Sequence, residues 1–418
     1  MDSLSDRLKA LGFIPATKLE KTIHSHPAAD FATVLHASEI SNSLGISHVV
    51  ENQYPLDYQH GSINFKMTAE IGFLSTAARV QTEEGTTLSK LLFLDTETTG
   101  LAGGTGTLAF LVGLGYFTPE GFRLKQYILK DPADEPAMLL EIINLCEQFS
   151  GIVTFNGKGF DVPLLRTRFV LNRLLNPFEQ MTHFDLLYLA RRLWRNRLQS
   201  RALQDLEHEI LDIPRTEDEV PGWMIPQIYF DYLRSNDPAP LKGVIYHNGM
   251  DILSLVALFL HLSTSFENIQ NVDQFDPIDY FSLGQLYYDL GFKEISQNIF
   301  VECDNLGLLP AHLKLSLYQR LGDLYKSQQN FEAAVVIWQK AVELEDIQSC
   351  IEIAKYQEHF ARDYDSAQIW TETAISFLSK KGYHTYQNRK LGKELLKRKD
   401  RLSQKIERKN GNVPEKTK

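Results

Sequence analysis

Two acidic residues near an apolar run have the types and spacing of metal ligands. Asp95 and Glu97 come directly after the apolar residues Leu91–Leu94. Residues two apart on a strand point to the same side, so both carboxylates would face one point in space. Two carboxylates beside a buried strand are costly unless a cation compensates them, and hard oxygen ligands suit Mg²⁺ or Mn²⁺. The spacing therefore predicts a metal site, the simpler alternative being a polar turn after the strand.

Two further segments each offer one more carboxylate. Asp161 follows the short apolar run Ile152–Phe155, where a helix is expected to begin, and its alternative role is an N-cap. Asp251 lies four residues after His247, so on a helix the two side chains would share one face. Asp251 would then be a fourth metal ligand and His247 the base that deprotonates an attacking water. The simpler alternative is a capped helix start with a surface histidine.

In this order the three segments resemble the motifs of the DnaQ-like DEDD 3′–5′ exonucleases, which have a ribonuclease H-like fold. The resemblance covers roughly residues 90–264. It implies hydrolysis of phosphodiester bonds by a mechanism with two divalent ions, Mg²⁺ or Mn²⁺. The residues that match the metal ligands of the family are Asp95, Glu97, Asp161 and Asp251.

The catalytic base is less well defined than the metal ligands. In the histidine branch of the family the histidine comes five residues before the last aspartate, and in the tyrosine branch the tyrosine comes four residues before it. Here His247 has the four-residue spacing to Asp251, and Tyr246 has the five-residue spacing. The sequence favours His247 as the base and leaves Tyr246 as the alternative.

Candidate substrate contacts lie near the same motifs and in a basic stretch after them. Thr98 follows Glu97, and Asn156 opens the segment that leads to Asp161. A group of arginines around a tryptophan could bind phosphates while the ring stacks on a base; the alternative is a buried tryptophan with solvated arginines. The basic stretch consists of Arg191, Arg192, Arg195, Arg197 and Arg201 around Trp194, and the substrate candidates in it are Arg191, Arg192, Trp194 and Arg195. Asp185, before it, is expected to cap a helix, or else to support the site from behind.

The elements around these residues indicate a mixed α/β sheet flanked by helices. Apolar runs predict strands at residues 91–94, 107–117, 122–129 and 152–155. The amphipathic stretch 134–149 predicts a helix. This pattern fits a ribonuclease H-like domain over residues 89–268. Residues 1–88 are left unassigned, apart from a short helix at 4–11 and strand-like alternation at 62–73.

The C-terminal part is expected to be all-helical and repetitive over residues 277–380. A pattern with Gly322, Trp338 and Ala341 returns in part about 33 residues later, which resembles tetratricopeptide helix pairs. These repeats would either bind a partner or pack on the nuclease domain. Residues 381–418 form a basic tail, predicted to be helical and then frayed. The simpler interpretation of the tail is a solvated helix face, and the alternative is a contact with nucleic acid or an acidic partner.

The nuclease motifs, the repeats and a glycine-rich loop at residues 101–107 together resemble a bacterial family that includes mitomycin repair factor B. This resemblance implies DNA repair together with a helicase partner, which the repeats would recruit. The substrate would then be DNA rather than RNA. Two alternatives stay open: an exoribonuclease of the same fold, and a repeat-mediated interaction protein whose nuclease domain is vestigial.

The composition constrains these hypotheses. The 418 residues carry a net charge of −10, so contact with nucleic acid must come from local basic surface. The three cysteines form no CxxC pair, which predicts buried thiols rather than a disulfide framework or a zinc site. The charged N-terminus is unlike a signal peptide, and the apolar run 252–262 is too short to cross a bilayer. We therefore expect a cytoplasmic protein without membrane contact.

Overall fold

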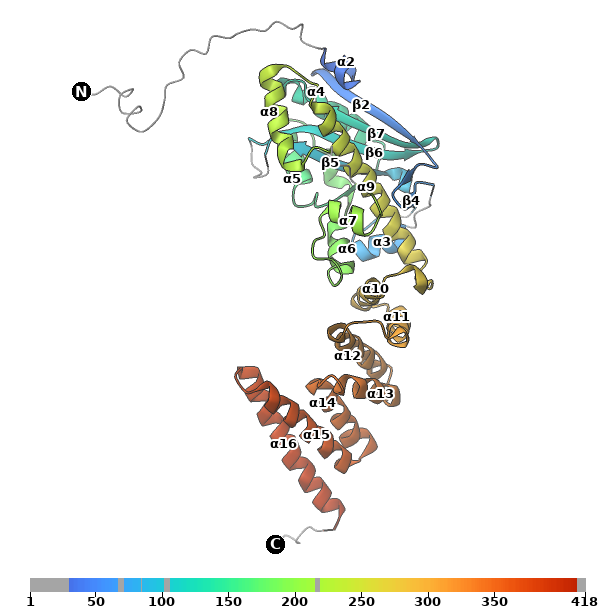
Figure 1. The fold of residues 1–418 in the computed structure, drawn as a ribbon, viewed down its shortest axis with the longest axis vertical. Coiled ribbons are helices and arrows are strands. Elements are labelled where there is room, and N and C mark those ends of the chain that lie inside the picture. The colour runs from blue at the N-terminus through green and yellow to red at the C-terminus, as the bar shows by residue number, and fades with distance from the viewer. Residues whose placement is uncertain (1–29, 67–70, 84, 101–105, 215–218, 412–418) are drawn as a thin grey trace, which may run out of the picture.

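The computed structural model describes residues 30–66, 71–83, 85–100, 106–214 and 219–411. A sheet with helices on both faces forms the upper part of the molecule in Figure 1, and a column of helices continues downward from it. The predicted fold class, a mixed α/β sheet flanked by helices and followed by a helical C-terminal region, is confirmed.

The central sheet of the described residues has seven strands in the order β1-β2-β7-β6-β5-β8-β9. β5 pairs in parallel with β8, and β8 with β9, whereas the other neighbours are antiparallel. The carboxyl ends of β5 and β8 therefore meet at one edge of the sheet, where the acidic motifs follow them. The strands are β1 (Ser38–Asn42), β2 (Gly45–Pro55), β5 (Leu91–Thr98), β6 (Ala109–Thr118), β7 (Gly121–Ile128), β8 (Gly151–Thr154) and β9 (Thr182–Asp185).

Residues 38–55, from the segment 1–88 that the sequence left unassigned, belong to this sheet although the domain was predicted to begin at residue 89. β2 pairs with β7 along its length, from His48 opposite Ile128 to Pro55 opposite Gly121. β1 then extends the sheet beyond β2. β7 thus pairs with a segment that ends about forty residues before the acidic motifs, and no local sequence pattern predicts this pairing.

The strand-like alternation at 62–73 was a wrong prediction for most of its length. Of the described residues in this range, those of β4 (Ile63–Asn64) form a strand, in a short hairpin with β3 (Gln59–His60), and the last three belong to the helix α3 (Ile71–Ala78). Ile71, Leu74 and Ala77 are buried at helical spacing and pack into the core, so burial against the rest of the domain favours a helix here rather than a strand. The predicted helix at 4–11 lies outside the described residues.

Helices cover both faces of the sheet, each over its own apolar core. One core lies under α4, α5 and α8, and the other lies under α3, α6 and most of α9. α9 contributes Leu241 and Val244 to the first core and its residues from Ile252 onward to the second, so this helix connects the two cores. The helices of this part are α2 (Phe31–Leu35), α3, α4 (Glu135–Cys146), α5 (Asp161–Leu171), α6 (Leu186–Leu193), α7 (Leu203–Glu209), α8 (Ile225–Ser235) and α9 (Leu241–Glu267).

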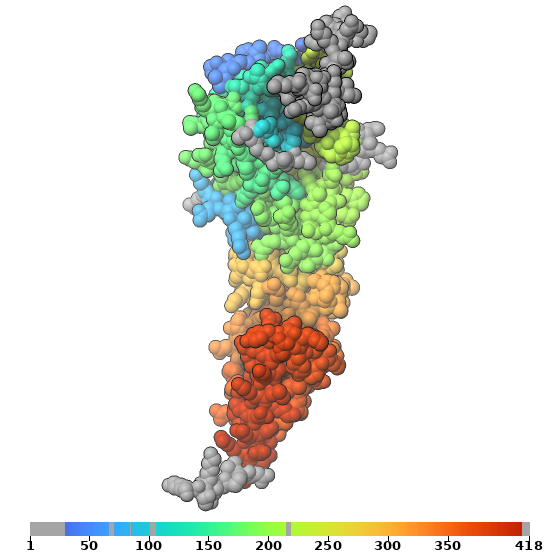
Figure 2. All heavy atoms as spheres, turned by 90° about the vertical axis from the view of Figure 1, so that its left-hand side faces the viewer, coloured from blue at the N-terminus to red at the C-terminus, as the bar shows by residue number. Residues whose placement is uncertain are grey.

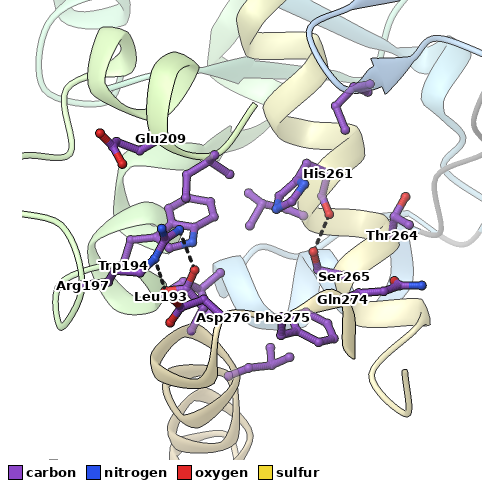
Figure 3. Close-up of a pocket in the computed structure, with 15 residues that line it drawn as sticks. Leu193, Trp194, Arg197, Glu209, His261, Thr264, Ser265, Gln274, Phe275 and Asp276 are labelled. Carbon is purple, nitrogen blue, oxygen red and sulfur yellow. Dashed lines mark hydrogen bonds and ion pairs between the residues drawn. The ribbon is translucent and has the colours of Figure 1, made fainter. Parts of the chain in front are cut away.

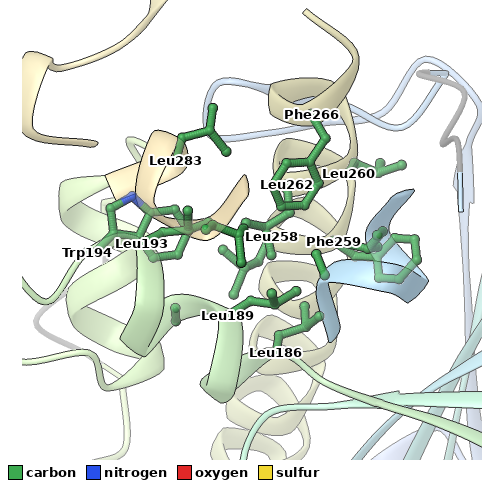
Figure 4. Packing of buried hydrophobic residues seen from close by; sticks show 14 of the residues in the cluster. Leu186, Leu189, Leu193, Trp194, Leu258, Phe259, Leu260, Leu262, Phe266 and Leu283 are labelled. Carbon is green, nitrogen blue, oxygen red and sulfur yellow. The ribbon is translucent and has the colours of Figure 1, made fainter. Parts of the chain in front are cut away.

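α9 is long and apolar enough to cross a membrane by length and composition, but 72% of its most apolar stretch is buried inside the protein. Leu258 and Leu262 have no exposed surface and lie beside the side chains of α6 (Figure 4). Phe259 is equally buried, and its ring packs against those of Phe93 and Phe184. This burial identifies α9 as a core helix.

The sheet domain and the helical region share one hydrophobic core. Leu193 and Trp194 at the end of α6 pack in the same cluster as Leu262 and Phe266 of α9 and Leu283 of the next helix (Figure 4). The boundary predicted between residues 268 and 277 therefore falls inside a continuous core rather than in an open linker.

Polar contacts cross the same junction. Arg197 lies 2.8 Å from Asp279, and Arg192 lies 3.0 Å from Asp289. A cavity of about 230 Å³ remains between α6, α9 and the next helix, with His261 on its wall (Figure 3). The junction is thus a packed and ion-paired interface within one chain.

The C-terminal helices pack in consecutive pairs, α10 with α11, α12 with α13 and α14 with α15. A Cβ on Gly284 would lie 2.8 Å from the ring of Phe300, and one on Gly322 would collide with the indole of Trp338. Glycines thus let aromatic rings fill the helix contacts, as the repeat pattern indicates. The helices are α10 (Pro277–Asp289), α11 (Lys293–Leu306), α12 (Ala311–Ser327), α13 (Phe331–Val342), α14 (Ile347–Tyr356), followed by a π-helical turn (Gln357–Ala361), α15 (Tyr364–Lys381) and α16 (Tyr386–Lys409).

Candidate active site

Asp95 and Glu97 lie at the carboxyl end of β5, on the side that faces α9. They continue the row of Leu91 and Phe93, whose side chains belong to the core beneath α9. Asn248 of α9 donates from Nδ2 to Oδ2 of Asp95 at 2.8 Å. α9 can approach the sheet closely at this point because residue 113 of β6 is a glycine. A Cβ at that position would collide with the side chain of Asn248.

Asp161 begins α5 beside the same end of β5. Its Oδ1 accepts a hydrogen bond from Oγ1 of Thr96 at 2.5 Å, and its side chain is buried. Thr96 points to the opposite side of β5 from Asp95, so Asp161 approaches the end of the strand from the α5 side. The predicted N-cap role is not observed, because Asp161 is the first residue of the helix and the capping position is Phe160.

The electrostatics of the site show that its carboxylates act on one another. Burial raises the pKa of Asp95 well above its ordinary value, and the negative charges of Asp251, Asp161 and Glu97 raise it further. Burial, Asp251 and Asp161 have the same effect on the pKa of Glu97. Burial raises the pKa of Asp161 to about 6, although the hydrogen bond from Thr96 lowers it. The structure thus gathers all four predicted carboxylates within electrostatic reach of one another.

Such a cluster fits divalent cations by its chemistry. Several buried carboxylates that repel one another are stabilised by a strong positive charge, and an all-oxygen donor set suits Mg²⁺ or Mn²⁺. Among the described residues, no three His, Cys, Asp or Glu side chains already stand in the arrangement of a metal site.

His247 lies between two of these carboxylates. Its Nε2 is 3.6 Å from Oδ2 of Asp251 and 4.0 Å from Oε1 of Glu97. Its Nδ1 is 2.9 Å from Oε1 of Glu219, and the imidazole is 6% exposed. Tyr246, the alternative base, is 50% exposed at the neighbouring helix position. The geometry therefore places His247, rather than Tyr246, against the carboxylates.

Glu219 is a part of the site that the sequence did not indicate. It belongs to no helix or strand, it precedes its partner His247 by 28 residues, and its side chain is 8% exposed. A carboxylate that accepts the Nδ1–H of a histidine fixes the orientation of the ring and leaves Nε2 as the acceptor. No spacing rule could have found it, because the contact is made only by the folded chain.

Asp185 organises the loop that leads to Asp161. It accepts hydrogen bonds from the backbone N–H of Asn156 at 2.8 Å and Lys158 at 3.0 Å. It also caps α6, accepting from the N–H of Leu187 at 3.1 Å. Both expected roles, helix cap and support of the site, are therefore combined in one side chain.

A cleft of about 610 Å³ opens beside the carboxylates. Asp95 and Asp251 lie on its wall, as do the substrate candidates Asn156 and Arg191. Arg201, the last arginine of the predicted basic stretch, lines it as well. The cleft therefore joins the acidic cluster to a basic rim of the kind that phosphates would contact.

The other substrate candidates do not line this cleft. Arg192 is paired with Asp289, and Arg195 is exposed outside the cleft. The hydroxyl of Thr98 is buried and donates to the carbonyl of Gly100 at 3.0 Å.

The interpretation of Trp194 as a stacking platform is corrected by its burial. The side chain is 3% exposed and packs in the core of α6 and α9, with its ring centroid 6.2 Å from that of His261. A ring enclosed in this way offers no face to a base. The alternative, a buried tryptophan among arginines at the surface, describes this position.

Comparison with known proteins agrees with this architecture. Residues 92–263 match the RNase_H superfamily. The uncharacterized protein YprB of Bacillus subtilis (strain 168) is 34% identical over 340 residues, which are 78% of this chain and 79% of that protein. The shared length exceeds the matched domain, so the likeness extends beyond it. Membership of this superfamily points to nuclease activity on a nucleic acid with divalent metal ions. The chain therefore belongs to the family of YprB, with a ribonuclease H superfamily domain at residues 92–263.

Proposed function

We propose that the chain is a metal-dependent exonuclease of the DEDD type that removes nucleotides from the 3′ end of DNA. The observation that carries this proposal is the meeting of four carboxylates from β5, α5 and α9 beside a buried histidine and an open cleft. The motifs in which they occur resemble those of the DEDD exonucleases. The residues that would hold two Mg²⁺ or Mn²⁺ ions are Asp95, Glu97, Asp161 and Asp251.

The protein groups would divide the work of phosphodiester hydrolysis. Two divalent ions held by the four carboxylates would supply the positive charge that stabilises the phosphodiester during hydrolysis. His247 would take the proton of the attacking water at Nε2, which faces Glu97 and Asp251. Glu219 would hold the opposite ring nitrogen and stabilise the imidazolium once the proton has moved. Glu219 is therefore a positioning residue in this scheme.

The proposed setting is DNA repair with a helicase partner bound by the C-terminal helices. The support is the combination of nuclease motifs, glycine-rich loop and helical repeats in one chain. The glycine-rich loop falls largely outside the described residues, and the helix pairs with glycines against aromatic rings support the repeat assignment. RNA is the competing substrate of the same site.

The decisive experiment replaces two carboxylates without changing their size. Asp95→Asn and Glu97→Gln are compared with Asp57→Asn, which removes an exposed carboxylate elsewhere. Metal contacts at a scissile phosphate are worth several kcal/mol, so each site variant should lose about 10³-fold in rate while the control keeps it. Matched DNA and RNA strands, blocked at either the 3′ or the 5′ end, are tested with Mg²⁺, with Mn²⁺ and with EDTA. Equal degradation by the site variants, or degradation in EDTA, would exclude the mechanism. Attack on 3′-blocked strands alone would reverse the direction, and preference for RNA would change the substrate.

A further inference from the structure

The last helix concentrates positive charge in a chain that is otherwise acidic. α16 contains ten Lys and Arg against three Asp and Glu, a net charge of +7. The whole chain carries −10, so the rest of it carries −17. Such segregation creates a local field that attracts anions despite the overall charge.

One buried carboxylate contacts three of the cations of α16. The side chain of Glu358, from the π-helical turn after α14, is 0% exposed. It lies 3.2 Å from Arg398 and 2.8 Å from both Arg401 and Lys405. Leu395 of α16 is buried in a cluster with residues of α14 and α15. These contacts hold the helix in place and account for three of its ten cations.

The outer side of α16 keeps its cations available. Lys390, Lys393, Lys397 and Arg408 are exposed, and within residues 219–411 no ion pair involves them. With 3.6 residues per turn, these four side chains fall in one sector on the side away from Leu395. Arg401, which is paired with Glu358, lies in the same sector. With 1.5 Å per residue, the stripe is about 27 Å long. Three acidic residues are present in the helix, so the stripe is basic but not uniformly so.

We propose that this outer face of α16 binds the phosphate backbone of a nucleic acid without regard to its sequence. The inference rests on the proposed function and extends it, because it gives the same substrate a second contact far along the chain from the carboxylates. Duplex DNA carries one negative charge per about 1.7 Å of axis, so a stripe of this length meets more than enough phosphates for each cation. Figure 2 shows the red C-terminal helices on the same face of the molecule as the green segments that include α5 and α6. A strand that leaves the cleft beside α6 could therefore continue toward α16.

The test measures binding separately from hydrolysis. A duplex of about 30 base pairs, roughly 100 Å long, can reach past the cleft. Its affinity for the full-length protein is measured in EDTA at several salt concentrations. The variant of the stripe combines Lys390→Gln, Lys393→Gln, Lys397→Gln and Arg408→Gln. The matched control removes the same charge from exposed positions elsewhere, with Lys66→Gln, Lys90→Gln, Lys130→Gln and Lys293→Gln.

We expect the stripe variant to bind the duplex about tenfold or more weakly at low salt, and the slope of log K against log salt to fall by about 3. The control should change neither quantity by a comparable amount. Both variants should keep the melting temperature of the parent, and both should hydrolyse a short oligonucleotide that fills only the cleft at the parental rate.

An unchanged salt slope in the stripe variant, or an equal loss in the control, would overturn the proposal. The proposal would also be overturned if the four substitutions weakened binding to vesicles of anionic phospholipid but left duplex binding unaffected. Stripe-dependent binding without any metal-dependent hydrolysis by the parent would instead refute the proposed function and leave the binding surface in place. The two proposals therefore fail by different measurements.

Discussion

Glu219 is expected to control the rate of hydrolysis through His247, without touching the substrate. Its Oε1 lies 2.9 Å from Nδ1 of His247, and both side chains are almost fully buried. A hydrogen bond to a charged group is worth about 1.5–3 kcal/mol when its loss leaves the partner buried. Since about 1.36 kcal/mol corresponds to a factor of ten, Glu219→Ala should lower kcat about 10- to 150-fold. KM should change little, because Glu219 does not line the cleft.

Single-turnover hydrolysis of a labelled DNA strand at saturating Mg²⁺ measures this loss. Glu219→Gln is the matched variant, because its amide oxygen can still accept the Nδ1–H, so it should recover part of the rate. The Mg²⁺ concentration that gives half-maximal activity should stay at the parental value in both variants. If Glu219→Ala keeps the parental kcat while His247→Ala abolishes activity, the positioning argument is wrong. A raised Mg²⁺ requirement would show instead that Glu219 helps to bind the ions.

Two further predictions concern the C-terminal helices. A chain that ends at residue 270 should lose the helices that cover Leu262 and Phe266. Burial of each such side chain is worth about 1.5–3 kcal/mol, so thermal unfolding should show a strongly destabilised or insoluble domain. A fragment as stable as the parent would contradict the shared core. Acid should release α16 from the helices on which it packs. Burial alone would raise the pKa of Glu358, but hydrogen bonds from Arg401 and Lys405 outweigh this effect and lower the pKa from 4.5 to about 2. The ionised carboxylate therefore stabilises the docked helix fully above pH 4.5, and this stabilisation is lost as the pH falls toward 2. Amide hydrogen exchange in α16 measures the release, and Glu358→Gln should already exchange faster at neutral pH.

Local signals account for the parts of the site that the sequence predicted. Asp95 and Glu97 follow an apolar run and are two residues apart, and His247 and Asp251 share one helical face. Each pair is positioned by a single element, so the period of that element is enough to predict their proximity. Placing the two pairs together required the family resemblance, because the distance between β5 and α9 is a property of the folded chain.

The missed and corrected features depend on contacts between distant segments. β2 has four consecutive buried residues followed by mostly exposed ones, so it lacks the alternation that marks a half-buried strand. Trp194 lies among arginines in the sequence, yet it ends the apolar face of α6 and enters the core at the junction with α10. In both cases the neighbours in space, rather than the neighbours in sequence, decide where the side chain lies.

The path of α9 links the candidate site to the C-terminal helices. The helix crosses β6 where a glycine at position 113 leaves room for Asn248, and this crossing places His247 and Asp251 beside β5. Beyond Ile252 the same helix is buried in the core that it shares with α10, α11 and α12. A close-packed core resists displacement of one helix without its neighbours. The helical region therefore helps to fix the position of His247.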